Sequence, residues 1–137
     1  MPALSPDQIA DEHLGHTLGI ELEEVSAERC VMTMPVGPRV HQPLGYLHGG
    51  ATVALCESVA SIGGTTGAPE GYVCFGLEIN ANHLRPKQDG MLRAVGERLY
   101  AGRTTQVWQV RVTDERDKLI CVCRCTLAVV KAGKGDG

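Results

Sequence analysis

The sequence lacks the features that would place it in a membrane, outside the cell or on nucleic acid. No run of about 18 consecutive apolar residues occurs, so a membrane-spanning helix is not expected. Lys and Arg number 13 against 16 Asp and Glu, and the net charge of −3 offers no general attraction for nucleic acid. Residues 1–7 contain neither a basic segment nor a hydrophobic core, unlike a signal peptide. We therefore expect a cytoplasmic protein that binds neither membranes nor nucleic acid.

Repeats and linkers are also absent, and a chain of 137 residues fits one domain. The hydrophobic fraction of 43% is ordinary for a globular core. Residues 1–130 are predicted to form this single domain. The Gly- and Lys-rich residues 131–137 are predicted to be a flexible C-terminal tail.

Six cysteines are present, but no Cys-x-x-Cys pair of the kind that holds zinc. Cys121, Cys123 and Cys125 alternate along the chain and would share one face of a strand. We interpret the cysteines as small buried hydrophobic residues rather than as metal ligands or disulfide partners. A Gly-x-Ser-x-Gly motif is missing too, which argues against Ser/His/Asp chemistry. No resident metal ion or cofactor is expected.

The arrangement of predicted elements favours an α+β fold. Ser5, Pro6 and Gln8 suit an N-cap, a first helical position and a capping box, so a short helix is predicted over residues 5–15. Strands are predicted over residues 18–25, 29–36, 72–84, 91–100, 104–113 and 119–130. Together with one long helix after the second strand, this order favours an antiparallel sheet packed on that helix.

The long helix is predicted over residues 51–62. Apolar residues recur on nearly all its faces, which is typical of a helix buried on all sides. Glu57 is the only charge in this run, and a lone carboxylate there is costly to bury unless it is satisfied or used. Gly63 and Gly64, followed by residues 67–71, are expected to end the helix and form a loop.

A family resemblance rests on the segment that leads into this helix. The pattern Gln-x-x-Gly-x-x-His-Gly-Gly at residues 42–50, followed by Glu57 and Ser61, resembles the hotdog-fold acyl-CoA thioesterases of the phenylacetate-degradation type. Residues 76–83 and 102–108 continue the match. They are similar to the branch that includes the hydrolases of 1,4-dihydroxy-2-naphthoyl-CoA and their enterobactin-pathway proofreading relative.

This resemblance implies both a fold and an activity. The fold would be a hotdog, an antiparallel sheet wrapped around one long central helix, with a short N-terminal helix. The activity would be hydrolysis of an aromatic or similar acyl-CoA thioester to the free acid and CoA. The CoA thioester would be the substrate and not a cofactor. The assembly would be a homodimer with shared active sites, paired again into a tetramer.

Thioester hydrolysis needs a stabiliser for the oxyanion and an oxygen nucleophile. The resemblance assigns the first role to the Gly49 amide, helped by the Gln42 side chain. It assigns the second to Glu57, either as a nucleophile that forms a mixed anhydride or as a general base on water. Ser61 would hold the attacking water or orient the carboxylate. His48 would contact the thioester region or position the hinge.

Structural alternatives accompany these roles. The two glycines could serve only a tight turn, and His48 and Ser61 could be ordinary structural residues. Two other functions are also conceivable: a non-catalytic module that binds acyl-CoA or an acyl carrier, and a dehydratase or hydratase. Glu57 argues against the binding module, because binding alone needs no carboxylate in an apolar helix. The Gln-x-x-Gly-x-x-His-Gly-Gly hinge argues against the dehydratase or hydratase.

Coenzyme A carries several phosphates, which arginine can bind through its forked guanidinium group. Arg85 and Arg103 lie in predicted loops at strand ends, and Lys87 is a weaker candidate. By resemblance, His83 and Thr104 join the two arginines in binding the nucleotide and pantetheine.

The spacing of Gly49 and Glu57 predicts that two chains build one active site. Eight helical steps separate them, about 12 Å along the helix axis, so a carbonyl at the Gly49 amide is hard to reach from Glu57 of the same chain. Two such helices packed antiparallel about a two-fold axis would bring each Glu57 near Gly49 of the other chain.

Overall fold

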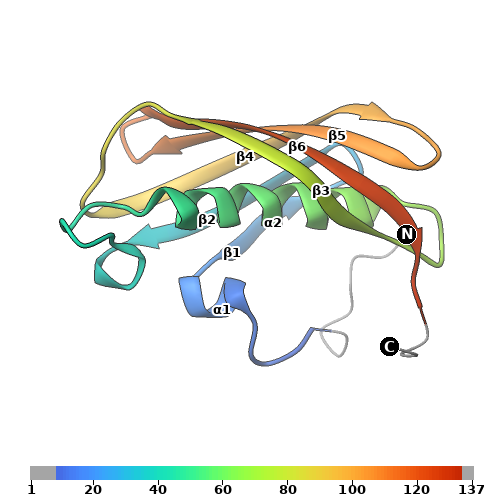
Figure 1. The fold of residues 1–137 in the computed structure, drawn as a ribbon, viewed down its shortest axis with the longest axis horizontal. Helices are drawn as coiled ribbons and strands as arrows, with labels where there is room; N and C mark the ends of the chain where they lie inside the picture. Colours follow the sequence, from blue (N-terminus) through green and yellow to red (C-terminus); the bar gives the residue numbers. More distant parts are fainter. Residues whose placement is uncertain (1–8, 134–137) are drawn as a thin grey trace.

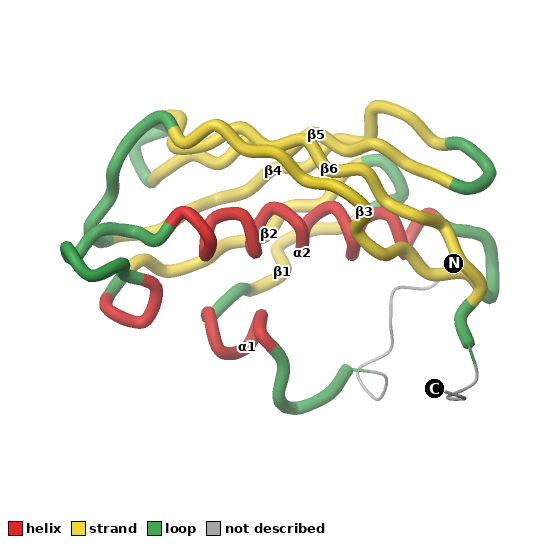
Figure 2. Tube along the Cα trace, in the orientation of Figure 1, coloured by secondary structure: helices red, strands yellow, loops and turns green. Residues whose placement is uncertain are grey.

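The computed structural model describes residues 9–133. Its elements are α1 (Leu14–Leu18), β1 (Glu21–Val25), β2 (Arg29–Val36), a 3-10 turn η2 (Pro38–Val40), α2 (Gly49–Gly67), β3 (Tyr72–His83), β4 (Gly90–Ala101), β5 (Thr105–Asp114) and β6 (Leu119–Lys131). The strands form one antiparallel sheet in the order β1-β2-β4-β5-β6-β3. The sheet curves over α2, which lies along one of its faces (Figures 1 and 2). The predicted hotdog architecture is confirmed.

Strand positions follow the alternation of apolar and polar residues closely. β2 has the predicted bounds, and the bounds of β3 to β6 each differ by at most one residue. β1 begins three residues later than predicted, because Leu18 belongs to α1. β6 runs to Lys131, and residues 134–137 of the predicted tail lie outside the described part.

The N-terminal helix differs from its prediction. Residues 9–13 are not helical, and α1 begins only at Leu14. His13 is its N-cap, with Nδ1 accepting a hydrogen bond from the backbone N–H of His16 at 3.2 Å. The helix ends at Gly19, whose φ of 75° lies in the left-handed region that glycine adopts without strain. The capping residues proposed at 5–8 lie outside the described residues.

The main core lies between α2 and the sheet. Leu55 and Val59 of α2 are fully buried, as are Trp108 and Val110 of β5, which face the helix side of the sheet as their alternation predicts. Burial of side chains of this size contributes roughly 1.5–3 kcal/mol each. The core therefore fixes α2 against the sheet and with it the residues at both helix ends.

Gly63 and Gly64 do not end α2, contrary to prediction. The helix continues through them to Gly67, and both glycines pack directly against side chains of the sheet. A Cβ at residue 63 would collide with the ring of Trp108, and one at residue 64 would collide with Leu127. Glycine in a helix costs about 1 kcal/mol relative to alanine, and here the close packing offsets that cost.

Within residues 9–133, no helix is both long enough and apolar enough to cross a membrane.

Candidate active site

The first turn of α2 leaves one backbone donor free. The N–H of Gly50 donates to Nδ1 of the N-cap His48 at 2.8 Å, and the N–H groups of Ala51 and Thr52 donate to the His48 carbonyl at 3.0 and 3.3 Å. Among the described residues, the Gly49 N–H has no acceptor. This amide also lies at the positive end of the helix dipole. The geometry therefore leaves the Gly49 amide free for a ligand, as the oxyanion role implied by the family resemblance would require.

The Gln42 side chain is held with its amide nitrogen available. Its Oε1 accepts hydrogen bonds from the backbone N–H groups of Leu44 at 2.6 Å and Tyr46 at 3.3 Å. The loop is closed further by the Gln42 N–H, which donates to the Tyr46 carbonyl at 2.7 Å. With Oε1 occupied, Nε2 is the part of the amide that can donate to a ligand.

One cavity of about 540 Å³ is lined by residues from two of the segments predicted to bind substrate. It is lined by Gln42 and Gly49 from the loop and helix start, and by His83 and Arg85 from the end of β3. The ring of His83 lies against the Gly49 backbone, since a Cβ at residue 49 would be 3.0 Å from its Nε2. A side chain at residue 49 would therefore crowd the His83 ring, whereas glycine leaves room for this close approach. Four of the predicted site residues therefore meet in one place.

The loop carrying Arg85 is tied to the loop carrying Gln42. The Leu47 N–H donates to the Lys87 carbonyl at 2.7 Å, and His41 Nε2 hydrogen-bonds the Gln88 carbonyl at 2.7 Å. The Lys87 side chain is only 8% exposed, and its ammonium group pairs with Glu115 at 3.0 Å. Lys87, the weaker phosphate candidate, is thus already engaged in holding this loop.

Glu57 lines a second cavity, of about 280 Å³, together with Ser61, which lies one turn further along α2. His13, Ile20 and Met32 line its other side. In the single chain Glu57 is exposed, so the prediction of a helix buried on all sides is wrong at this position. Its carboxylate is available to a ligand and needs no buried partner.

The structure does not bring all predicted site residues together in one chain. Glu57 and Ser61 are in a different cavity from Gly49. His48 lines a third, with Leu14 and Arg39 on its walls.

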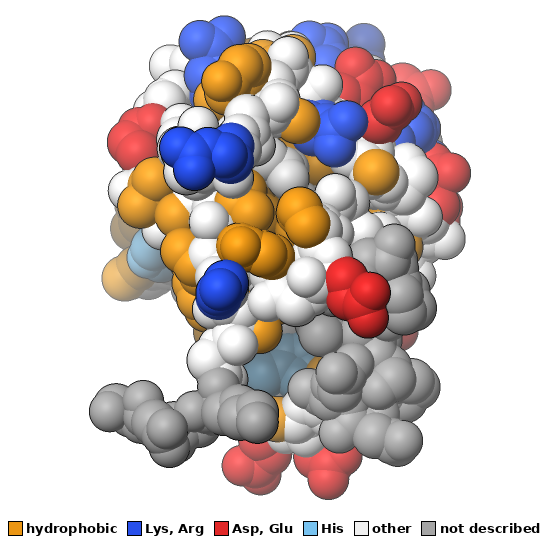
Figure 3. Space-filling model, turned by 90° about the vertical axis from the view of Figure 1, so that its right-hand side faces the viewer, with side chains coloured by type: hydrophobic (Ala, Val, Ile, Leu, Met, Phe, Trp, Pro, Cys, Tyr) orange, Lys and Arg blue, Asp and Glu red, His pale blue; other side chains and the backbone are white. Residues whose placement is uncertain are grey.

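The two arginines proposed for phosphate binding are also far apart. Arg103 and Thr104 lie in the turn after β4, whereas Arg85 precedes β4. A strand of 12 residues, about 40 Å long, separates them. Figure 3 views the end of the molecule where β4 turns into β5, and shows Lys and Arg side chains set among exposed hydrophobic ones.

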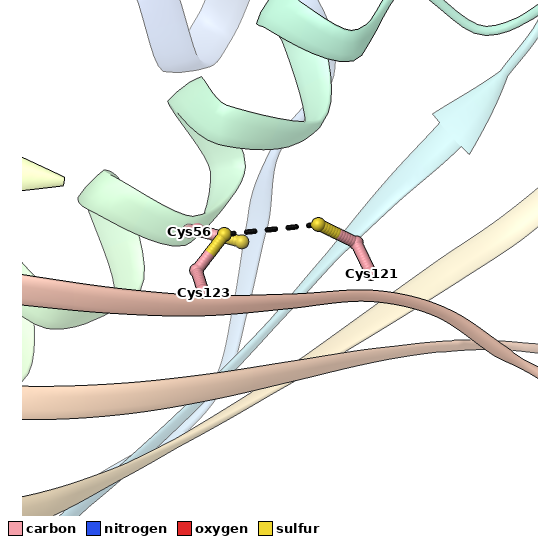
Figure 4. A group of neighbouring side chains, drawn as sticks. All are labelled: Cys56, Cys121 and Cys123. Carbon is pink, nitrogen blue, oxygen red and sulfur yellow. Dashed lines mark hydrogen bonds between the residues drawn. The ribbon is translucent and has the colours of Figure 1, made fainter. Parts of the chain in front are cut away.

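All six cysteines are free and buried, as predicted. Burial raises the pKa of Cys30 to about 12 and that of Cys125 to about 11, so both are neutral thiols at pH 7. The structure also places Cys56 of α2 beside Cys121 and Cys123 of β6 (Figure 4). Sequence spacing did not reveal this group, because its members come from elements that meet only in the fold.

Thr52 is a second residue that sequence reasoning missed. It is fully buried, lines the cavity that contains Gly49, and its hydroxyl has no hydrogen-bond partner. The signal in the sequence was a polar residue on an apolar helix, three positions after Gly49.

An antiparallel sheet curved over one long helix is the arrangement found in hotdog-fold thioesterases. The chain belongs to the Thioesterase superfamily, whose family model matches residues 44–121. It is 48% identical over 121 residues to the 1,4-dihydroxy-2-naphthoyl-CoA hydrolase of Listeria monocytogenes, covering 88% of this chain and 98% of that protein. It is 42% identical over 113 residues to the Escherichia coli hydrolase of the same name, and the match covers 82% of this chain and 83% of that protein.

A solved structure also supports this family assignment. The crystal structure of a thioesterase from Haemophilus influenzae has a TM-score of 0.86 and 40% sequence identity, covering 93% of this chain and 89% of that one. The protein is therefore a hydrolase that cleaves thioesters.

Proposed function

We propose that the protein hydrolyses an aromatic acyl-CoA thioester to the free acid and CoA. The first candidate substrate is 1,4-dihydroxy-2-naphthoyl-CoA, an intermediate of menaquinone biosynthesis, and benzoyl-CoA and phenylacetyl-CoA are the next. The names of the two relatives support the first choice. The observation that carries the proposal is the unoccupied Gly49 N–H in one cavity with Gln42 and Arg85.

The thioester carbonyl is polarised at the start of α2. The Gly49 N–H and the Gln42 Nε2 are the two donors, and both are held in place before substrate arrives. Donors fixed in this way stabilise the oxyanion without reorganising during the reaction. Coenzyme A extends from this point past His83 and Arg85.

Glu57 supplies or activates the attacking oxygen. As a nucleophile it forms a mixed anhydride that water then opens; as a general base it takes a proton from water. Ser61, in the same cavity, holds the attacking water or orients the carboxylate. His48 acts through the hinge, since its ring caps α2 and leaves the Gly49 amide free.

The active site is formed between two chains. Phe75 and Leu77, on the edge strand β3 beside Glu57, are 63% and 62% exposed. A 12-residue edge strand with exposed apolar side chains needs a covering partner. A second copy with α2 antiparallel would bring its Glu57 to the Gly49 of the first chain. Arg103 and Thr104 reach a CoA at Arg85 only from another chain, which supports further pairing into a tetramer.

The proposed chemistry needs no added metal ion or cofactor, because a carboxylate and hydrogen-bond donors suffice. Turnover should persist after treatment with a chelator. Loss of turnover that zinc restores would contradict this part of the proposal.

A thiol-release assay over a panel of acyl-CoA thioesters tests the function. The panel contains the three aromatic thioesters and an acetyl, a palmitoyl and an enoyl thioester. We expect kcat/KM to be highest for an aromatic thioester. Tight binding without thiol release would indicate a binding module, and hydration of the enoyl thioester would indicate a hydratase.

A further inference from the structure

Thr52 carries a hydroxyl that the folded chain leaves without a partner. Its side chain is fully buried, and among the described residues its Oγ1 is the only buried side-chain nitrogen or oxygen with no hydrogen bond. Two other hydroxyls of α2, those of Ser58 and Thr66, donate to carbonyls four residues back at 2.7 and 2.8 Å. A buried polar group without a partner is destabilising, so something other than the chain is expected to meet the Thr52 hydroxyl.

The position of Thr52 indicates what that partner is. Residues three apart on a helix share a face, so Thr52 lies below Gly49, about 4.5 Å further along the axis. Both line the cavity of about 540 Å³, with Gln42 and His83. Thr52 therefore belongs to the wall of the space in which the thioester is proposed to react, and its hydroxyl lies buried within that wall.

One reacting atom of the thioester still lacks a protein group. Gly49 and Gln42 serve the carbonyl oxygen, and Glu57 serves the attack on carbon. When the C–S bond breaks, its electron pair passes to sulfur, which leaves as a thiolate. An ordinary thiol has a pKa of about 8.5, so this thiolate can leave without a proton but gains from a hydrogen bond.

We propose that Thr52 is a catalytic residue whose hydroxyl donates a hydrogen bond to the thioester sulfur as it becomes a thiolate. The inference rests on the proposed hydrolysis of acyl-CoA at this site. It also explains why the hydroxyl has no partner within the chain.

The test compares Thr52→Val, which keeps the shape and removes the hydroxyl, with Thr52→Ser, which keeps the hydroxyl. For a CoA thioester, Thr52→Val should lower kcat about 10- to 100-fold, as expected for a lost hydrogen bond to a charged group. Thr52→Ser should retain most of the activity. The melting temperature of Thr52→Val should be unchanged or higher, because a buried hydroxyl without a partner is replaced by a methyl group. The matched control Thr66→Val removes a satisfied hydroxyl of α2 and should lower the melting temperature without changing kcat.

Thioesters whose leaving thiols differ in acidity show whether the Thr52 hydroxyl bonds the sulfur or the carbonyl oxygen. With thioesters of acidic aromatic thiols, whose thiolates need little help, the defect of Thr52→Val should shrink toward none. An equal defect for all leaving groups would assign Thr52 to the oxyanion instead, and wild-type kcat in Thr52→Val would also overturn the proposal. A wild-type protein that releases no thiol would instead refute the proposed function.

The three neighbouring thiols support an independent inference. The Sγ atoms of Cys56, Cys121 and Cys123 all lie within 4.8 Å of one another, and those of Cys121 and Cys123 are 3.8 Å apart. Three sulfur atoms that each lie about 2.3 Å from one bound atom are roughly 4 Å apart. As Figure 4 shows, the thiols gather between α2 and β6. A single thiophilic atom can therefore bond all three with small shifts.

The net charge of the complex decides which chemical element suits this group of three thiols. The three residues belong to the hydrophobic core and are at most 1% exposed. Three thiolates around a divalent ion carry a net charge of −1, which is costly to bury. Three thiolates around a trivalent atom carry none.

We infer that the trithiol group of Cys56, Cys121 and Cys123 binds trivalent arsenic. Arsenous acid and three thiols give one arsenic bonded to three sulfurs and three water molecules. The three thiol protons leave with the three hydroxyl groups, and no atom is oxidised or reduced. Binding is expected to be slow, since the closed core must open locally to admit the reagent.

Native mass spectrometry of the protein with arsenite tests this inference. We expect a mass gain of one arsenic less three hydrogens per chain, accompanied by a raised melting temperature. Each of Cys56→Ala, Cys121→Ala and Cys123→Ala should abolish this species. The matched controls Cys30→Ala and Cys74→Ala, which remove buried thiols outside the group, should retain it. The inference would be overturned if the wild type formed no arsenic adduct or if the controls lost the adduct equally. Stronger stabilisation by zinc than by arsenite would also overturn it.

Discussion

Gly76 on β3 lies where the carboxylate of Glu57 on α2 passes, and a Cβ at residue 76 would collide with Oε1 of Glu57. The ladder between β3 and β6 also shifts register between Gly76 and Glu78, so β3 bulges at this point. Bulges often occur beside active sites, where they redirect a neighbouring side chain. The strand and the helix together therefore set the direction of the Glu57 carboxylate.

Gly76→Ala is expected to displace this carboxylate and lower kcat by at least about tenfold, because small misplacements of a reacting group are costly. Steady-state kinetics together with circular dichroism checks the prediction. Gly37→Ala is the matched control, since a Cβ at residue 37 meets nothing within 4 Å. Equal kinetics for both variants would show that Gly76 does not position Glu57.

Glu57→Ala should reduce turnover by at least about 10²-fold, as for loss of a nucleophile or general base. Its exposure in the single chain predicts that the fold remains intact. Glu70→Ala removes an exposed carboxylate just beyond the end of α2 and should leave turnover unchanged. A folded Glu57→Ala protein with near-normal turnover would remove Glu57 from the mechanism.

Arg85→Ala should raise KM for a CoA thioester more than it lowers kcat, because phosphate binding is remote from the reacting carbon. Arg103→Ala should behave in the same way, acting from another chain. With a pantetheine thioester that lacks the nucleotide, both variants should match the wild type. Equal losses on the two substrates would place these arginines outside the nucleotide site.

A mixture of two inactive variants tests whether two chains share one site. Glu57→Ala and Gln42→Ala proteins are unfolded together and reassembled. If sites are shared, the mixed dimer contains one site with both defects and one with neither, so activity returns. A site within one chain would always keep one defect, and the mixture would stay as inactive as its parents.

Local patterns in the sequence were sufficient for the strands, and a family resemblance supplied the candidate chemistry of the helix start. Alternation of apolar and polar residues placed β2 to β6 within one residue of their observed bounds. The resemblance carried by Gln42, Gly49 and Glu57 implied a candidate oxyanion site and a carboxylate. The strand patterns and this motif each lie within a short stretch of chain, which is why they could be found in the sequence by itself.

Tertiary packing decided the rest. α2 passes through Gly63 and Gly64 because Trp108 and Leu127 occupy the space their side chains would need. Cys56 meets Cys121 only because α2 crosses β6.

Arg85 and Arg103 flank the strand predicted over residues 91–100. The structure confirms this strand as β4, which keeps the two arginines at opposite ends of it. The sequence by itself determined the strands and offered candidate residues such as Gln42, Gly49 and Glu57, but it did not reveal Thr52 or the three neighbouring cysteines. Sheet register and helix packing decided which of them meet, because contacts between distant segments are set by how whole elements bury their apolar faces together.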